Sequence, residues 1–390
     1  MGMIRCLITC VALLTPVSSW QFAHAQDGAA LTPLWNVDLR EAGYSPQPGF
    51  QFSLSSRPHT VALLSQHSVT VSQSGHIAIA FLTEEIGGKS TDIYGSRVLH
   101  LISLDAATGR IVANRAWAVP NADTYVGASK EGNLVMLRYD SAGPAVCVYS
   151  PYLQEIRRID FPSDPVTSTS SWSIFVPPSG TSVFVEHRLN NTDSVKMLDS
   201  RTLREVRAWE NSGSIESVSG HYFLWCEGQS PNDVSLYTWA FETPWSAVAN
   251  LGPCLRSEAA FINEDTLVMN RRDSVSLIRA DGQVLFTAPM PKNRAAEDAG
   301  ASPDGRFVIV ATTTKAGLAI ALAFDMSKGP APRRILVYDT KTSTVVDSLR
   351  FTSYVGAFSP DSSRFAVLNG RILKMYQLPS SVSAGSGQKR

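Results

Sequence analysis

A turn followed by an apolar strand recurs along the chain and constrains its fold more than any other feature. The stretch "SPDGRFVIVA" (302–311) returns as "SPDSSRFAVL" (359–368). Pro presets φ, Asp bonds its own backbone and Gly accepts positive φ, so these residue types predict a tight turn. The apolar, β-branched run that follows predicts a buried strand.

Further copies of this turn and strand fill the rest of the chain. They read "SQSGHIAIAF" (72–81), "SKEGNLVMLR" (129–138), "PPSGTSVFVE" (177–186), "SVSGHYFLWC" (217–226) and, in degenerate form, "INEDTLVMNR" (262–271). Each copy continues into a strand, a polar corner and another strand. The corners begin at Asp105, Asp199 and Asp339, whose side chains can cap the turn. With the short strand before each turn, a complete unit has four strands.

Seven such units predict an all-β fold, a seven-bladed β-propeller of four-stranded antiparallel blades. A β-sandwich is the alternative, but it does not need a repeated corner. The expected blades span 66–117, 123–160, 171–209, 214–249, 258–288, 297–350 and 353–378. The last unit lacks a fourth strand, and "PLWNVDL" (33–39) is expected to supply it and close the ring.

The segments outside the repeats are assigned from composition. Residues 26–65 are expected to be an N-terminal segment that contains the ring-closing strand and an irregular crossover over 40–65. The propeller is assigned to 66–378, and "SSVSAGSGQKR" makes 379–390 a flexible tail.

The chain resembles the bacterial secreted propellers of the WD40-like and YVTN type. The resemblance rests on the "SPD" turns at Ser302 and Ser359 and on the corners at Asp105 and Asp339, and it covers roughly 31–378. It implies the fold rather than a function. The corner "LDAATGRIVANRAW" is also similar to the start of the quinoprotein-dehydrogenase motif, but Val112 and Ala113 stand where its tryptophan belongs. No quinone or other cofactor is therefore expected.

The first residues are typical of a secretory signal peptide. Arg5 precedes the apolar run "CLITCVALL", and "AHA" ends at Ala25, where we expect cleavage after residues 1–25. An uncleaved anchor is the alternative, but no apolar stretch reaches the roughly 18 residues of a membrane span. The sequence therefore predicts an exported protein, periplasmic or extracellular, with no integral membrane segment after cleavage.

Charge argues against polyanionic partners. The full chain has 34 basic and 34 acidic residues, and removal of the leader takes Arg5 alone, so the mature chain has 33 against 34 and a net charge of −1. Such a chain has no strong field to attract nucleic acid.

Three cysteines follow the leader, namely Cys147, Cys226 and Cys254. An odd number in an oxidising compartment allows at most one internal bridge, and Cys226 with Cys254 is one possible pair. The favoured interpretation is three small buried hydrophobic side chains. No two mature histidines have i, i+4 ligand spacing, and His76 and His221 share one repeat position, which favours a structural use.

No linear catalytic motif is present, so no catalytic, cofactor or metal residue is assigned. Two long loops between second and third strands, 83–96 and 312–333, are the candidate binding segments. The second loop contains an apolar run that is expected either to pack on the propeller or to contact a partner. The candidate residues are Glu84, Glu85, Asp92, Tyr94, Lys315, Leu318, Ile320, Leu322 and Phe324.

The function that follows is an exported, non-catalytic propeller, expected to be a monomer, that binds a protein, peptide or glycan across one rim. The alternative is a propeller hydrolase or lactonase with a divalent metal in the central channel, because propeller active sites can be assembled from scattered residues. Elemental analysis of the mature protein distinguishes the two.

Overall fold

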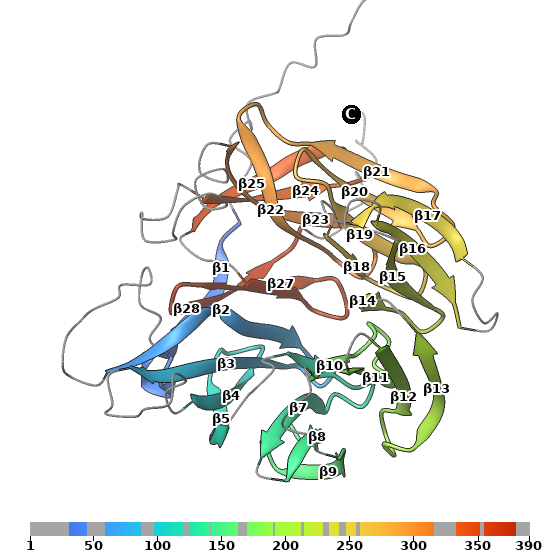
Figure 1. Cartoon of the computed structure of the whole chain (residues 1–390). Helices are drawn as coiled ribbons and strands as arrows, with labels where there is room; N and C mark the ends of the chain where they lie inside the picture. The colour runs from blue at the N-terminus through green and yellow to red at the C-terminus, as the bar shows by residue number, and fades with distance from the viewer. Residues whose placement is uncertain are drawn as a thin grey trace, which may run out of the picture.

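The chain is described here from a computed structural model. The structure describes residues 31–44, 59–86, 97–119, 125–140, 142–162, 170–189, 192–211, 214–228, 234–241, 247–254, 258–315, 333–351 and 355–379. Within these ranges the chain forms seven four-stranded antiparallel sheets (Figure 1). The fold is a seven-bladed β-propeller, as the repeats predicted.

Blades 1 to 3 follow each other along the chain. Blade 1 consists of β2 (His59–Val71), β3 (His76–Ile86), β4 (Arg97–Asp105) and β5 (Ile111–Val119). Blade 2 consists of β6 (Val126–Ala128), β7 (Leu134–Asp140), β8 (Gly143–Tyr149) and β9 (Glu155–Asp160). Blade 3 consists of β10 (Ser170–Phe175), β11 (Ser182–Leu189), β12 (Thr192–Asp199) and β13 (Glu205–Asn211).

Blades 4 to 6 have the same strand order. Blade 4 consists of β14 (Ser214–Val218), β15 (Tyr222–Gly228), β16 (Val234–Ala240) and β17 (Ala247–Pro253). Blade 5 consists of β18 (Glu258–Phe261), β19 (Thr266–Asn270), β20 (Ser274–Arg279) and β21 (Val284–Pro289). Blade 6 consists of β22 (Arg294–Ala301), β23 (Phe307–Thr314), β24 (Arg333–Asp339) and β25 (Thr344–Phe351).

Blade 7 joins the two ends of the chain. It consists of β26 (Val355–Phe358), β27 (Arg364–Asn369), β28 (Ile372–Gln377) and β1 (Pro33–Asp38), which pairs antiparallel with β28 as its outer strand (Figure 1). The ring-closing strand predicted from the sequence is therefore confirmed. The indole N–H of Trp35 also donates 3.0 Å to the carbonyl of Ala106, which ties this strand to blade 1.

The crossover into blade 1 is shorter than expected. A 3₁₀ helix, η1 (Leu39–Ala42), follows β1, and β2 begins at His59, inside the segment expected to be irregular. Its first residues pair with the end of β3, Thr60 opposite Glu85. In the part of the chain that the structure describes, no helix combines the length and the hydropathy that a membrane span requires.

The apolar core is divided among the seven junctions between blades. The strand β23 shows why: Phe307, Ile309 and Ala311 pack toward blade 7, whereas Val308 and Val310 pack toward blade 5. Side chains alternate across a strand, so a strand buried on both faces reads as a continuous apolar run. This geometry explains the unbroken "FVIVA" of the repeat.

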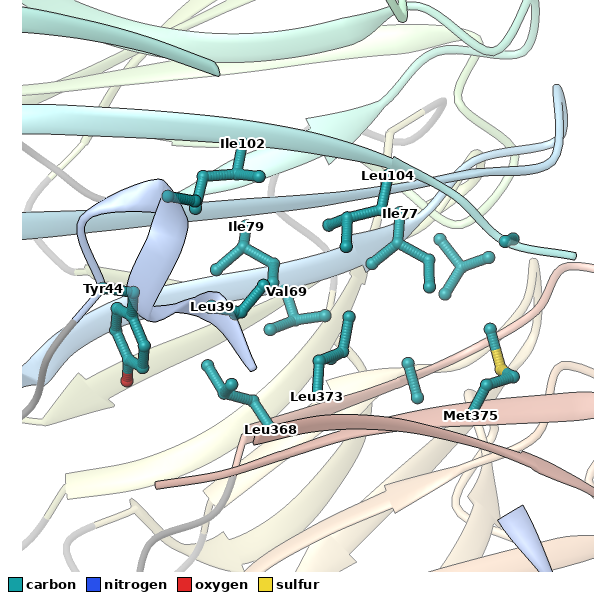
Figure 2. Packing of buried hydrophobic residues seen from close by; sticks show 14 of the residues in the cluster. Leu39, Tyr44, Val69, Ile77, Ile79, Ile102, Leu104, Leu368, Leu373 and Met375 are labelled. Atoms are coloured by element: carbon teal, nitrogen blue, oxygen red, sulfur yellow. The ribbon is translucent and has the colours of Figure 1, made fainter. Parts of the chain in front are cut away.

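The junction between blades 7 and 1 has the same construction (Figure 2). Ile77 and Ile79 of β3 meet Leu373 and Met375 of β28, and Leu39 of η1 is fully buried among them. Burial of one such side chain contributes roughly 1.5–3 kcal/mol relative to exposure. The junction that closes the ring is thus packed like the others.

Candidate functional site

The strand directions give the ring two rims. The first strands of neighbouring blades contact one another, for example β2 with β26 and β14 with β18, so these strands line the inside of the ring. We call "turn rim" the side with the turns between first and second strands and the corners between third and fourth strands. We call "loop rim" the side with the connections between second and third strands and the crossovers between blades.

The polar residues of the repeated turns bond within the turn. The Ser302 hydroxyl donates 2.6 Å to Asp304 and accepts 2.9 Å from the backbone N–H of Phe307. The Ser359 hydroxyl donates to Asp361 and accepts 2.9 Å from the N–H of Arg364. The "SPD" residues of blades 6 and 7 therefore hold the same turn.

The acidic corner residues cap their turns as expected. The carboxylate of Asp105 accepts 2.8 Å from the N–H of Thr108 and 2.7 Å from its hydroxyl, and Asp199 does the same with Thr202. These bonds hold the pKa of Asp105 below its usual range, the side-chain bond of Thr108 being the largest cause. In blade 6 the Asp339 carboxylate accepts 2.9 Å from the N–H of Lys341.

The two histidines of the repeat position are held by local contacts. Nδ1 of His76 lies 3.1 Å from the carbonyl of Ser74, and its ring is edge-on to Tyr152 at 6.1 Å. The His221 ring is edge-on to Tyr222 at 6.4 Å, and its carbonyl accepts 3.0 Å from the N–H of Phe241. The contact with Tyr152 joins the turn of blade 1 to the corner of blade 2, and the bond to Phe241 joins the turn and the corner of blade 4.

A small pocket lies on the turn rim between blades 5 and 6. Its volume is about 210 Å³, below the roughly 300 Å³ at which ligand pockets begin. The amide of Asn263 in its wall already donates 2.8 Å to the carbonyl of Pro303, and Asp304 belongs to the turn of blade 6. The lining residues are Asn263, Thr266, Leu277, Leu285, Phe286, Asp304, Gly305, Thr340 and Lys341.

Two cysteines are joined near the loop rim of blade 4. Cys226 of β15 and Cys254, directly after β17, form a disulfide with a Cα–Cα distance of 5.9 Å. The favoured expectation of three unpaired thiols is therefore wrong for this pair, because Cys254, just after the end of β17, lies within bonding distance of Cys226. Cys147 remains a free, buried thiol.

One group of potential metal ligands exists among the residues that the structure describes, and it contains this disulfide. The carboxylate of Glu216 and the sulfur atoms of Cys226 and Cys254 lie within 4.8 Å of one another. Zinc binds thiolate sulfur, and disulfide sulfur atoms are not thiolates. In the oxidised protein the group therefore offers a single carboxylate.

An acidic residue on the inner strand of blade 6 has a perturbed ionisation. A bulge at Glu297 precedes Asp298 in β22. The Asp298 side chain is exposed to solvent, yet the protein packed around it raises its pKa, against the N–H of Ala299, which lowers it, and with the charge of Glu297, which raises it further. Exposure and a raised pKa are compatible because a carboxyl group on an innermost strand can face solvent inside the ring while protein surrounds it on most other sides.

The loop rim is uneven around the ring. The long connections are residues 87–96 in blade 1 and 315–332 in blade 6, whereas blade 7, between them, connects its second and third strands through residues 370–371 alone. The other connections span 141–142, 190–191, 229–233 and 271–273. Both long connections are shorter than expected, because β3 continues to Ile86 and β24 begins at Arg333.

The candidate residues are placed only in part. Glu84 and Glu85 lie in β3 rather than in a loop, Glu84 opposite Arg97 in register, and their side chains are outside the description. Lys315 forms a 2.8 Å ion pair with Asp273 of blade 5. The positions outside the described residues are Asp92, Tyr94, Leu318, Ile320, Leu322 and Phe324.

Two arginines that sequence reasoning missed lie at the loop rim of blade 6. Arg294 opens β22, and Arg334 is the second residue of β24. The strand β23 runs between them, with Thr314 opposite Arg294 and Thr312 opposite Arg334. They are forty positions apart in the sequence, so only the strand register could have suggested that they lie close together.

Comparisons with known proteins name no family for this chain. No protein-family profile and no curated protein sequence matches the chain. Among solved structures, the Dos1 propeller is 12% identical with a TM-score of 0.46, over 86% of this chain and 95% of that chain. A chain of the Mitotic Checkpoint Complex is 12% identical with a TM-score of 0.48, over 96% of this chain and 100% of that chain.

A third similar structure is Hsv2 of Kluyveromyces lactis, 14% identical with a TM-score of 0.41, over 63% of this chain and 69% of that chain. Identities this low concern the fold alone. The assignment as a seven-bladed propeller therefore rests on the strand order of the chain itself.

Proposed function

We propose that the chain is an exported, non-catalytic binding module whose loop rim holds a protein, peptide or glycan. The observation that carries the proposal is the unevenness of this rim. The two longest connections, 87–96 and 315–332, belong to blades 1 and 6, which flank blade 7 with its two-residue connection. Long connections on a rigid scaffold are where binding residues are most often found.

The opposite rim supports this choice of surface. Its serine, aspartate and threonine side chains are engaged in turns and corners, as at Ser302 and Asp105. Groups that hold a turn have little hydrogen-bonding capacity left for a ligand. On the loop rim, by contrast, Arg334 is exposed at the root of the long connection of blade 6.

The proposed export agrees with the disulfide. Structural disulfides persist in oxidising compartments and are rare in the cytosol. A bridge between Cys226 and Cys254 fits a chain whose first residues have the composition of a secretory leader. Protein sequencing of the N-terminus after secretion tests this part of the proposal, and the expected new N-terminus is Gln26.

Loop replacement tests the proposed surface. In one variant a short Gly-Ser turn replaces 316–328, in a second it replaces 88–95, and a third carries Lys341→Ala and Thr342→Ala on the turn rim as a control. Each is immobilised and exposed to an extract of the native cell envelope. We expect both loop variants to keep the thermal midpoint of the parent and to lose bound partners that the control retains.

Two outcomes would contradict the proposal. One is that both loop variants fold and retain the same partners as the parent. The other is that the turn-rim control alone loses them. Size-exclusion chromatography with light scattering on the parent protein tests the expected monomer in the same preparation.

A further inference from the structure

Arg294 and Arg334 lie on either side of one buried threonine. The Arg294 guanidinium donates from Nη1 to the hydroxyl of Thr312 at 3.1 Å and to its carbonyl at 3.4 Å. The hydroxyl of Thr312 in turn donates 3.1 Å to the carbonyl of Arg334. Thr312 is fully buried, so it fixes where the partly buried Arg294 side chain lies.

The positive charge of this pair is not neutralised within the described residues. The pKa of Arg294 is lowered, first by burial of the guanidinium and second by the charge of Arg334. No carboxylate contributes to that shift. Two like charges near each other therefore oppose their own ionisation, which an anion placed between them would relieve.

Two other basic residues on the same rim, Lys315 and Arg371, have acidic partners. Lys315 is paired at 2.8 Å with Asp273, the acidic residue of the adjoining connection of blade 5. Arg371 of blade 7 is paired with Asp38 at 3.1 Å. Arg334 has no such pair among the described residues, and its side chain is exposed.

We infer that Arg294 and Arg334 bind an oxyanion, a carboxylate or phosphate group, of the ligand held at the loop rim. Guanidinium groups present their N–H donors in a planar fork that matches both kinds of oxyanion. The inference rests on the proposed function for the choice of rim and adds the chemistry of the ligand. Thr312 acts as a positioning residue for Arg294.

Titration with simple anions tests the site without knowledge of the partner. Mature protein with its disulfide intact is titrated with inorganic phosphate and, separately, with acetate, at constant ionic strength set by sodium chloride. Binding is followed by amide chemical shifts in NMR spectra. We expect saturable shifts in blade 6, and we expect Arg334→Gln and Arg294→Gln each to weaken binding at least about 10-fold, because charge-assisted hydrogen bonds are lost.

The controls are arginines that already have acidic partners. Arg279→Gln on the turn rim removes a side chain paired with Asp281 at 3.4 Å, and Arg371→Gln removes the one paired with Asp38. Both are expected to bind the anions like the parent. Arg334 is exposed, so its variant remains informative if Arg294→Gln disturbs folding. Saturation by phosphate alone would indicate a phosphorylated ligand, and saturation by acetate would indicate a carboxylate.

The inference is overturned if neither anion gives saturable shifts in blade 6, or if all four variants respond like the parent. Its failure is separable from failure of the proposed function. If the parent binds anions but the loop variants keep their partners, the oxyanion site stands and the proposed loop-rim binding surface is contradicted. If the loop variants lose their partners but the parent binds no anion, the loop-rim surface stands and the oxyanion site is contradicted.

Discussion

The backbone N–H of Asp304, in the turn of blade 6, donates a 3.1 Å hydrogen bond to the hydroxyl of Ser362, in the turn of blade 7. Similar bonds join other turns: the Ser74 hydroxyl donates 3.0 Å to the carbonyl of Gly132, and the N–H of Lys130 donates 2.9 Å to the carbonyl of Gly180. The repeated turn is therefore both a turn within a blade and a joint between blades.

Substitution of Ser362 by alanine is expected to lower the free energy of unfolding by about 1 kcal/mol, because it leaves the Asp304 N–H without its acceptor. Ser343→Ala is the matched control. Ser343 has a φ of 55° against 59° for Ser362, so both substitutions meet the same backbone conformation. Urea unfolding followed by fluorescence measures the difference, and equal effects in the two variants would show that the joint contributes nothing.

Alanine substitutions at two glycines of the repeated turn distinguish the stability cost of backbone strain from the cost of crowding between blades. Gly75→Ala and Gly180→Ala both place a side chain at positive φ, 76° and 65°. An added Cβ at Gly75 meets nothing within 4 Å, whereas at Gly180 it meets the backbone nitrogen of Lys130 at 2.5 Å. We expect a loss of roughly 1–2 kcal/mol at Gly75 and a larger loss, on the order of 3–4 kcal/mol, at Gly180.

The same unfolding experiment compares the two glycine variants. Similar losses would mean that the turns of blades 2 and 3 can separate without cost, contrary to the contact seen between Gly180 and Lys130.

Removal of the disulfide tests whether it stabilises the fold. Cys226 and Cys254 are 28 positions apart, and closing a loop of that length is expected to contribute roughly 3–4 kcal/mol. We expect the double variant Cys226→Ala, Cys254→Ala to unfold at a lower urea concentration than the parent. Cys147→Ser is a poor control because Cys147 is fully buried; the parent under a dithiol reductant is the better one, and an unchanged midpoint in both would contradict the prediction.

The repeats predicted the architecture because their signals are local and recur. Seven copies of a turn and a doubly buried strand define the blades, with capped corners at Asp105, Asp199 and Asp339, and even the ring-closing strand β1 followed from a last unit that lacked a fourth strand. The degenerate copy forms the same turn: Ile262 stands at the serine position, and the side-chain oxygen of the next residue, Asn263, accepts 2.9 Å from the N–H of Thr266.

The sequence could not show relationships that depend on how strands are aligned. Arg294 and Arg334 come together only because β23 pairs with a strand on each side, and a bulge before Asp298 shifts that register by one residue. Cys254 approaches Cys226 because β17, whose end it follows, lies two strands from β15 in the same blade. Neither event has a local motif, so the oxyanion site and the disulfide required the structure.

The acid on the inner strand of blade 6 predicts a pH dependence of stability. Burial raises the pKa of Asp298 in the folded protein, so folding favours the protonated carboxyl group and ionisation costs stability. This cost is absent below the ordinary pKa of about 3.9 and grows as the pH rises through the folded value. Asp298→Asn, which is uncharged, should therefore unfold at a higher urea concentration than the parent at pH 7 and match it near pH 3.

Asp105→Asn provides a control of opposite sign. The bonds from Thr108 lower the pKa of Asp105, so its ionised form stabilises the fold above the ordinary pKa, and the contribution disappears as the pH falls through the folded value. This variant should be less stable than the parent at pH 7, with a difference that shrinks toward acid pH. Paired urea titrations at several pH values measure both differences, and a loss of stability at pH 7 for Asp298→Asn would show that its carboxylate is stabilised by charges inside the ring rather than opposed by burial.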